Sequence, residues 1–182
     1  LAAGRLRELI GVHQAIFALY GNGLWNNGSH VIDFIRMLFG EIESVQALGV
    51  MNRMSSSPIA GDVDVPFALG LPGNCMAVAQ PIDFRCYREV CLDVWGERGR
   101  LSIVNEGLTL LLSPIKVNRA MQSEREVDSC HPVFIESTVG HALYALYSNL
   151  ASAVIEGAPL WSTGASAMEV ARVAEAVVRS SI

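Results

Sequence analysis

One stretch of the sequence sets residues that can transfer protons beside a long apolar run. It reads GNGLWNNGSHVIDFIRMLFG and covers residues 21–40. At about 100° per residue in a helix, Asn26, His30 and Asp33 fall within one narrow polar stripe. An imidazole with a pKa of ~6.5 can accept or donate a proton near neutral pH. The stripe therefore predicts an acid–base site centred on His30.

Both ionisable residues of this stripe also have a structural interpretation. His30 could be a hydrogen-bonded polar residue that faces a loop. Asp33 follows it by about one helical turn, so its carboxylate could orient the imidazole ring or could pin the helix to a neighbouring arginine. The spacing leaves these alternatives open.

A helix over residues 25–39 must position the stripe. Its other side gives it an apolar face for a core, made of Val31, Ile32, Phe34, Ile35, Leu38 and Phe39. Asn26 or Asn27 can serve as the N-cap, and Gly40 suits the position just after the last helical residue. The sequence thus predicts an amphipathic helix with both of its ends marked.

Segments rich in β-forming residues surround this helix. Strands are predicted over residues 9–20, 42–51, 63–71, 75–82, 87–95, 100–104 and 108–112. The Pro-Gly-Asn segment at 72–74 and the Gly-Glu-Arg-Gly segment at 96–99 are typical of hairpin turns. Residues 52–61 are expected to form a surface loop, and residues 115–132 fit either a strand or a loop.

Two more helices are predicted near the end of the chain, over residues 141–156 and 165–180. Gly157 and Pro159 end the first, and the Ser-Thr-Gly segment at 162–164 caps the second. One face of the first helix carries Leu143, Leu146, Tyr147, Leu150 and Val154. The second is expected to pack inward through Met168, Ala171, Ala174 and Val178.

This order of elements predicts a single α+β domain over residues 1–182. A run of strands followed by helices favours a largely antiparallel open β-sheet with the helices on one face. The strand residues are apolar on both sides, with Val90 and Leu92 on one side and Cys91 and Trp95 on the other. Because the helices can cover only one face, we expect a second copy to cover the other, in a homo-oligomer that is a dimer or tetramer.

The composition excludes several classes of partner. A net charge of −5 provides no basic patch for nucleic acid. The hydrophobic content is 51%, yet the apolar runs stay far below the ~20 residues that cross a bilayer, so no membrane partner is expected. The four cysteines lack CxxC spacing, which predicts no metal site and free thiols in a reducing cytoplasm. The sequence also lacks the motifs of dinucleotide-binding and phosphate-binding loops.

Several segments together resemble one protein family. GSHVID at 28–33, followed by LFGEIESV at 38–45, is similar to the core of the C-terminal domain of the Gfo/Idh/MocA oxidoreductases. These are relatives of glucose–fructose oxidoreductase and inositol dehydrogenase. DVWGERGR at 93–100, IEGAP at 155–159 with STG at 162–164, and residues 169–180 resemble later segments of the same domain, in the same order. The resemblance covers nearly the whole chain.

The resemblance implies a two-domain enzyme of which this chain is the substrate-binding and oligomerisation domain. An N-terminal Rossmann domain, missing from this chain, would bind NAD or NADP and carry a Glu-Lys-Pro motif whose lysine takes part in proton transfer. The family places an aspartate four residues before its catalytic histidine. These positions fall on Asn26 and His30 here. Asn26 can hydrogen-bond a substrate hydroxyl or orient His30, but it cannot act as a base.

Together, the resemblance and the stripe predict a function. The chain is expected to be the C-terminal domain of an NAD(P)-dependent oxidoreductase that transfers hydride between a sugar, cyclitol or sugar-derivative alcohol and nicotinamide. The implied substrate contacts are Tyr20, Trp25, Asn27 and Asp33. By itself the chain should be inactive. The alternative is a non-catalytic binding or dimerisation module derived from the same family, which the replacement of the acid by Asn26 favours.

Overall fold

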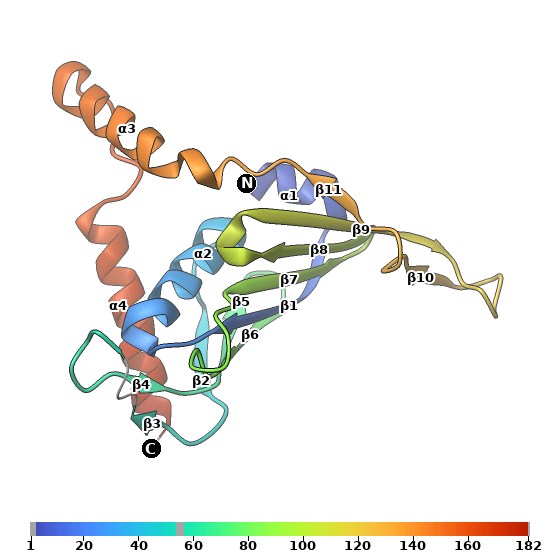
Figure 1. Cartoon of the computed structure of the whole chain (residues 1–182), viewed down its shortest axis with the longest axis horizontal. Helices are drawn as coiled ribbons and strands as arrows, with labels where there is room; N and C mark the ends of the chain where they lie inside the picture. The colour runs from blue at the N-terminus through green and yellow to red at the C-terminus, as the bar shows by residue number, and fades with distance from the viewer. Residues whose placement is uncertain (1–2, 54–56, 182) are drawn as a thin grey trace.

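The structure is a computed structural model that describes residues 3–53 and 57–181. The strands of its main sheet are β1 (His13–Tyr20), β2 (Ser44–Ala47), β5 (Phe67–Leu71), β6 (Cys75–Pro81), β7 (Cys91–Gly96), β8 (Gly99–Val104), β9 (Thr109–Val117), β10 (Arg125–Val127) and β11 (Val133–Ile135). They lie in the order β10-β9-β8-β7-β1-β6-β5-β2, and β11 also pairs with β9 (Figure 1). A separate pair is formed by β3 (Asn52–Arg53) and β4 (Val63–Asp64).

In the residues that the structure describes, four α-helices and three short helical turns accompany the sheet. The α-helices are α1 (Ala3–Ile10), α2 (Ser29–Phe39), α3 (Ala142–Glu156) and α4 (Gly164–Ser180). The turns are η1 (Leu24–Gly28), η2 (Asn105–Gly107) and η3 (Val139–His141). Within the described residues, no helix is both long and apolar enough to cross a membrane.

The sheet is mixed but mostly antiparallel. The central strand β1 runs parallel to β6 and antiparallel to β7, and the other neighbouring strands pair antiparallel. Both predicted hairpins form, with Leu71 opposite Cys75 and Gly96 opposite Gly99. The α+β class and the largely antiparallel open sheet are therefore confirmed.

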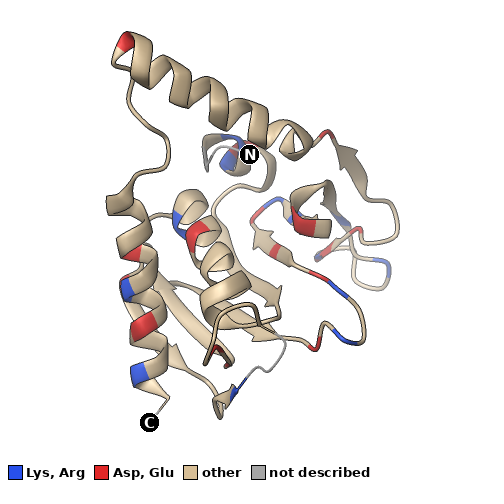
Figure 2. Ribbon diagram, turned by 60° about the vertical axis from the view of Figure 1, so that its left-hand side comes forward, with Lys and Arg blue, Asp and Glu red and all other residues tan. Residues whose placement is uncertain are grey.

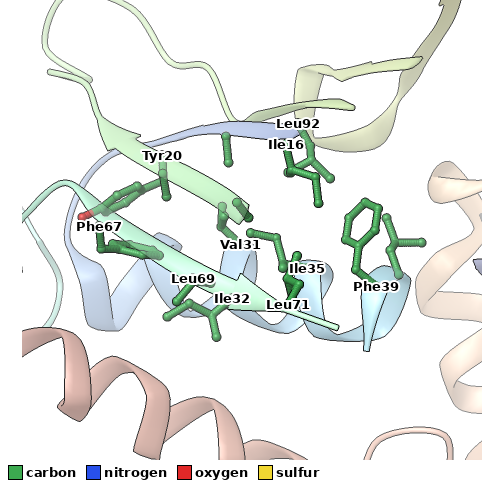
Figure 3. Close-up of a cluster of buried hydrophobic side chains, with 14 of the residues drawn as sticks. Ile16, Tyr20, Val31, Ile32, Ile35, Phe39, Phe67, Leu69, Leu71 and Leu92 are labelled. Atoms are coloured by element: carbon green, nitrogen blue, oxygen red, sulfur yellow. The ribbon is translucent and has the colours of Figure 1, made fainter. Parts of the chain in front are cut away.

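The main core lies between α2 and one face of the sheet. Ile32 and Ile35 of α2 are completely buried and point toward Leu69 and Leu71 of β5 (Figure 3). Helix α4 runs along α2 and β2 and buries Val170, Ala174 and Val177. Met168, which was predicted to pack inward, is instead mostly exposed, and Ala171 and Val178 are only partly buried. The helix is therefore rotated relative to the predicted face.

The N-terminal boundary of the first strand differs from its prediction over residues 9–20. Residues up to Ile10 form α1, and β1 begins only at His13. Leu6 and Ile10 lie one helical turn apart and are both buried in the main core. This packing as a helix overrides the β propensity of residues 9–10, with which the predicted strand began. Gly11, at φ +78°, then breaks the helix.

The boundaries of three other strands also differ from their predictions. The strands predicted over 42–51 and 87–95 shrink to β2 and β7, whereas β9 extends to Val117 and returns through β10. The region 115–132, left open between strand and loop, is thus largely a β-hairpin. Part of the loop predicted over 52–61 lies outside the described residues.

Helix α3 departs most from the predicted packing. Figure 1 shows it extending away from the sheet, while α2 and α4 lie together. Every residue of the apolar face predicted for α3 is exposed. This helix is therefore the exception to the predicted arrangement of helices on one face of the sheet.

Candidate active site

The N-terminus of the site helix is capped by a carboxylate from a distant loop. Asp62 is completely buried, and its two oxygens accept hydrogen bonds from the backbone N–H groups of Trp25 (2.9 Å) and Asn26 (3.2 Å). The hydroxyl of Ser57 donates to the same carboxylate at 2.7 Å. The prediction that Asn26 or Asn27 caps the helix is therefore wrong, because the free N–H groups already have a stronger, charged acceptor.

A second carboxylate explains the Gly-Asn-Gly turn before the helix. Asp64 accepts a hydrogen bond from the N–H of Gly23 at 3.0 Å. Gly23 has φ +102°, and a Cβ atom on it would lie 1.8 Å from an oxygen of Asp62. Only glycine lets the backbone come so close to the two acids. Burial raises the pKa of Asp64 above its ordinary value, and the hydrogen bond from Gly23 opposes that shift.

The first turn of the helix is a π-turn, and it changes which asparagine faces the site. The N–H of Gly28 donates to the carbonyl of Gly23 at 3.0 Å, five residues earlier. A π-turn rotates each residue by less than the 100° of an α-helix. Asn27 therefore lines the cavity next to the helix, whereas Asn26 does not. The amide of Asn26 donates instead to the carbonyl of Asn22 at 3.2 Å.

The cavity beside α2 has a volume of about 710 Å³. Its walls come from α2, the start of β7, the η2 turn and the start of α3. Most of the lining is apolar, and the polar side chains in it are Asn27, His30, Asp33, Arg88 and Glu106. An apolar pocket with a few polar groups is typical of a site for a small organic ligand.

His30 lies in this cavity as an exposed side chain. Within the described residues its ring makes no hydrogen bond, so both ring nitrogens are available to a ligand. The carboxylate of Asp33 also lines the cavity and is 3.9 Å from the guanidinium of Arg36. That distance makes a weak ion pair, and no bond joins Asp33 to His30 in the described part of the chain. Both side chains therefore line the cavity without a strong hydrogen bond to another described residue.

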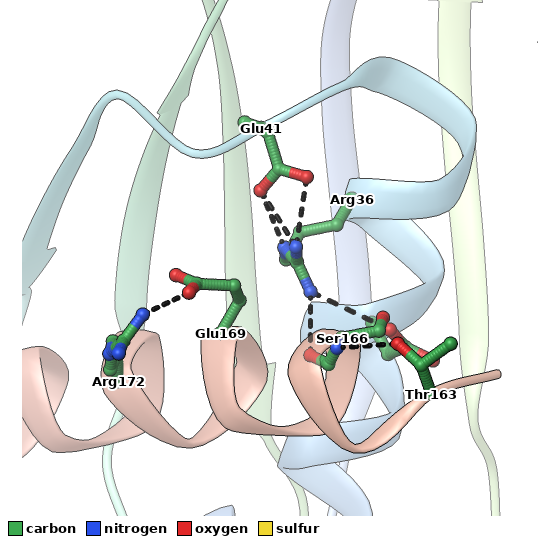
Figure 4. Close-up of polar contacts among 7 residues, drawn as sticks. Arg36, Glu41, Thr163, Ser166, Glu169 and Arg172 are labelled. Carbon is green, nitrogen blue, oxygen red and sulfur yellow. Dashed lines mark hydrogen bonds and ion pairs between the residues drawn. The ribbon is translucent and has the colours of Figure 1, made fainter.

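Arg36 fixes the site helix to the rest of the fold. Its nearly buried guanidinium pairs with both oxygens of Glu41, at 2.7 and 2.9 Å, and donates to the carbonyl of Ser166 at 3.1 Å (Figure 4). The second contact joins α2 to the first turn of α4. The Asp62 cap and Arg36 thus hold both ends of the helix that carries His30.

Two cavity residues were missed at the sequence level. Arg88 pairs with Glu106 and lies over the ring of Phe84, with 5.2 Å from its guanidinium carbon to the ring centroid. Glu106 has φ +58°, between Asn105 and Gly107, which also have positive φ. Arg88 lies inside the strand predicted over residues 87–95, and Glu106 lies between the strands predicted over 100–104 and 108–112. The backbone of the β8–β9 connection, with its positive φ angles, brings the two side chains together. The hydrogen bond to Glu106 raises the pKa of Arg88.

Tyr20 and Trp25 do not reach the cavity. Tyr20 is completely buried, and its hydroxyl donates to the carbonyl of Val65 at 2.6 Å and accepts from the N–H of Val65 at 3.1 Å. Burial also raises its pKa well above the ordinary value, so the phenol stays protonated. Trp25 packs against the core as a partly buried side chain. The expected substrate contact by Tyr20 is corrected to a structural role.

A cysteine, Cys91, also lines this cavity. Burial raises its pKa to about 11, so the thiol is protonated at neutral pH. In residues 3–53 and 57–181, no group of three or more His, Cys, Asp or Glu residues is placed to hold a metal ion. His30 is the histidine among the residues that line this cavity.

A second cavity, of about 650 Å³, lies at the end of β6 near the β3–β4 pair. Its charged side chains include Asp83 and Arg85, which pair with each other at 2.7 Å. No histidine lines it, so it lacks the acid–base group that distinguishes the cavity beside α2.

Residues 13–102 match the family model described as the GFO/IDH/MocA C-terminal domain. No curated protein sequence matches the chain. Among solved structures, an oxidoreductase from Bacillus subtilis is 20% identical over 97% of this chain and 57% of its own, with a TM-score of 0.68. Levoglucosan dehydrogenase in complex with NADH and levoglucosan is 16% identical over 100% of this chain and 60% of its own, with a TM-score of 0.74.

An oxidoreductase from Agrobacterium radiobacter in complex with NAD+, L-tartaric acid and magnesium is similar too. It is 13% identical over 98% of this chain and 57% of its own, with a TM-score of 0.64. At these identities the likeness is one of fold. This chain spans less than two thirds of the length of each of these structures.

Proposed function

We propose that this chain forms the substrate-binding part of a nicotinamide-dependent oxidoreductase. The premise is that it belongs to the GFO/IDH/MocA family as a C-terminal domain. The nicotinamide of NAD or NADP, when bound, exchanges a hydride with the carbinol carbon of a sugar, cyclitol or sugar derivative. Similar folds in complex with NADH and levoglucosan, and with NAD+ and L-tartaric acid, support this class of cofactor and substrate.

The observation that carries the proposal is the position of His30. Its imidazole faces a cavity of about 710 Å³ and has no hydrogen-bond partner among the described residues. We assign to it the proton of the reacting hydroxyl, which it accepts during oxidation and returns during reduction. Asn27 and Asp33 line the same cavity and can hydrogen-bond the neighbouring hydroxyls of a sugar. Asn26 contributes through the turn that it stabilises.

The N-terminus of the site helix does not fit the diphosphate of a nicotinamide cofactor. Its N–H donors are already bound to the carboxylates of Asp62 and Asp64. Two acids at this point would repel a phosphate, which usually binds at free N–H groups of a helix. We therefore assign the cofactor to an N-terminal domain that precedes this chain.

Replacement of His30 tests the proposed role in the protein that includes the preceding domain. We expect His30→Ala to lower turnover by about 10²-fold or more, because general acid–base catalysis is lost. His131→Ala is the matched control, since His131 is an exposed histidine that pairs with Asp128 outside the cavity. Turnover near that of the wild type in His30→Ala would remove His30 from the mechanism.

A non-catalytic binding or dimerisation module is the second candidate function. The observation that favours it is Asn26, which stands where the family has an acid and is turned away from the cavity. The reading frame upstream of residue 1 distinguishes the two functions. An intact glycine-rich fingerprint and a Glu-Lys-Pro motif there support the enzyme, and their loss supports the module.

We also propose that a second copy covers the outer face of the sheet. Phe17, Trp95 and Arg100 lie on this face, because their neighbours along each strand point into the core. The Nε atom of Arg100 is buried and has no hydrogen-bond partner in the described part of the chain. Sedimentation of the chain at about tens of micromolar should show a dimer or larger, since open sheet faces of this kind form obligate interfaces. A monomer would contradict this.

We place the protein in the cytoplasm. Cys75, Cys86, Cys91 and Cys130 are free thiols, as is typical of proteins in a reducing compartment.

A further inference from the structure

Helix α3 exposes apolar side chains along its whole length. Leu143, Tyr144, Tyr147, Val154 and Ile155 are each 66–80% exposed. Its sequence, ALYALYSNLASAVIE, has Glu156 as its single charged residue, at the end of the helix (Figure 2). A helix that is apolar all round is typical of a covered element. The described part of this chain does not cover it.

The chain that follows this helix is ordered by a side chain of the helix itself. The side chain of Asn149 donates to the carbonyl of Pro159 at 2.9 Å and accepts from the N–H of Trp161 at 2.9 Å. Gly157, in the left-handed conformation, closes the helix. These bonds order the connection from α3 to α4, which packs on α2. A surface that is already ordered loses little conformational entropy when a partner docks.

The start of α3 borders the candidate active site. Ala142 and Leu143 line the same cavity as His30. In both Figure 1 and Figure 2, α1, the first described element, lies beside the start of α3. A domain joined to the N-terminal side of α1 therefore arrives next to α3 and next to the cavity. Its tether gives it a high effective concentration there.

Solved structures of this fold contain additional chain that needs a contact surface. Levoglucosan dehydrogenase aligns with 100% of this chain, which covers 60% of its length. We propose, resting on the function proposed above, that α3 is the docking surface for the N-terminal cofactor-binding domain. We place this domain on α3 and a second copy on the outer sheet face. Among the described elements, α3 is the one that combines an apolar surface, the proximity of α1 and the rim of the cavity.

Hydroxyl-radical footprinting of two forms of the protein tests this docking. The forms are the 182-residue chain and the protein that includes the segment preceding residue 1. We expect Tyr144, Tyr147 and Trp161 to be oxidised rapidly in the short form and to be protected in the long form. Met121 is exposed to a similar degree on the distant β9–β10 hairpin. It serves as the internal control and should react equally in both.

A charged double variant sharpens the test. Tyr147→Lys with Val154→Lys places two charges seven residues apart on one side of α3, and lysine preserves helix propensity. In the long form this variant should lose the protection of Trp161, because each apolar side chain contributes about tenfold or more to docking. The control variant, Val117→Lys with Val133→Lys, changes two exposed valines of β9 and β11. It should retain the protection.

Four outcomes separate this docking from its rivals. Rapid oxidation of all three side chains in the long form would overturn it. Protection already present in the 182-residue chain, at a concentration where it sediments as a dimer, would also overturn it, since a second copy would then cover α3. If the long form turns over substrate with NAD or NADP while α3 remains unprotected from oxidation, the docking would be overturned and the proposed function would stand. A protected α3 in a protein that binds neither NAD nor NADP would support the docking and overturn the proposed function.

Discussion

The site helix α2 and the helix α3 have similar apolar content but opposite surroundings. The apolar side of α2 is buried on the sheet, its N-terminus is capped by Asp62, and Arg36 ties its last turns to α4. The apolar residues of α3 remain exposed, and the side chain of its buried Asn149 bonds, among the described residues, only to the loop that follows the helix. The local sequence thus specifies a helix in both cases. Whether the helix is covered depends on other segments, and the described part of this chain covers α2 but not α3.

Truncation of one apolar side chain in each helix gives the largest expected contrast. Ile35→Ala in α2 should lower the free energy of unfolding by about 3 kcal/mol, because it opens a cavity in a packed core. Val154→Ala in α3 should change it by less than about 0.5 kcal/mol, since that side chain is already in water. Urea unfolding of the 182-residue chain measures both values. A loss in Val154→Ala as large as in Ile35→Ala would show that α3 is covered in this chain.

Removal of the Asp62 carboxylate should have the next largest effect. Asp62→Ala leaves the N–H groups of Trp25 and Asn26 buried without their acceptor. We expect a loss of about 2 kcal/mol in the free energy of unfolding, as for other lost caps and buried hydrogen bonds. Glu43→Ala, at an exposed glutamate for which no side-chain hydrogen bond is found in the described residues, should leave the urea midpoint nearly unchanged. Equal midpoints for the two variants would contradict the assignment of Asp62 as the cap.

The smallest expected effect is a pH dependence that comes from Asp64. Burial raises its pKa in the folded state above the ordinary 3.8. As the pH rises through the interval between these values, the unfolded chain loses the proton first, so the folded state loses stability. The stability of the wild type relative to Asp64→Asn should therefore fall with pH across this interval and stay constant above it.

Asp83 provides a control of opposite sign for this pH dependence. The hydrogen bond from Arg85 lowers its pKa to about 2, so its contribution to stability is present above 3.8 and is lost as the pH falls toward 2. Chemical unfolding of both asparagine variants between about pH 2 and pH 6 measures the two slopes. Slopes of the same sign would contradict the burial of Asp64.

The features that the sequence predicted correctly depend on neighbouring residues. Gly40 and Gly157 end their helices, and Thr163 caps α4 by accepting from the N–H of Ser166 at 3.1 Å, because these contacts lie within a few residues. Helical periodicity likewise predicts that His30 and Asp33 share one side of α2, and both line the same cavity. The order of the elements then led to the correct fold class.

The features that were missed depend on contacts between distant segments. The Asp62 cap joins residues more than 30 positions apart, and Arg88 meets Glu106 only through the strained β8–β9 turn. The π-turn that rotates Asn26 away from the cavity forms next to Gly23, where Asp62 and Asp64 accept hydrogen bonds from backbone N–H groups. No periodicity in one segment can reveal an acceptor supplied by another.

The central claim is that this chain supplies the substrate half of a nicotinamide-dependent site, and calorimetric titration tests it most directly. NADH and NADPH should give no measurable binding to the 182-residue chain, because the helix N-terminus that could hold a diphosphate is occupied by Asp62 and Asp64. The protein that includes the preceding segment should bind one of them. Tight binding of either cofactor by the short chain, or of neither by the long one, would contradict the account.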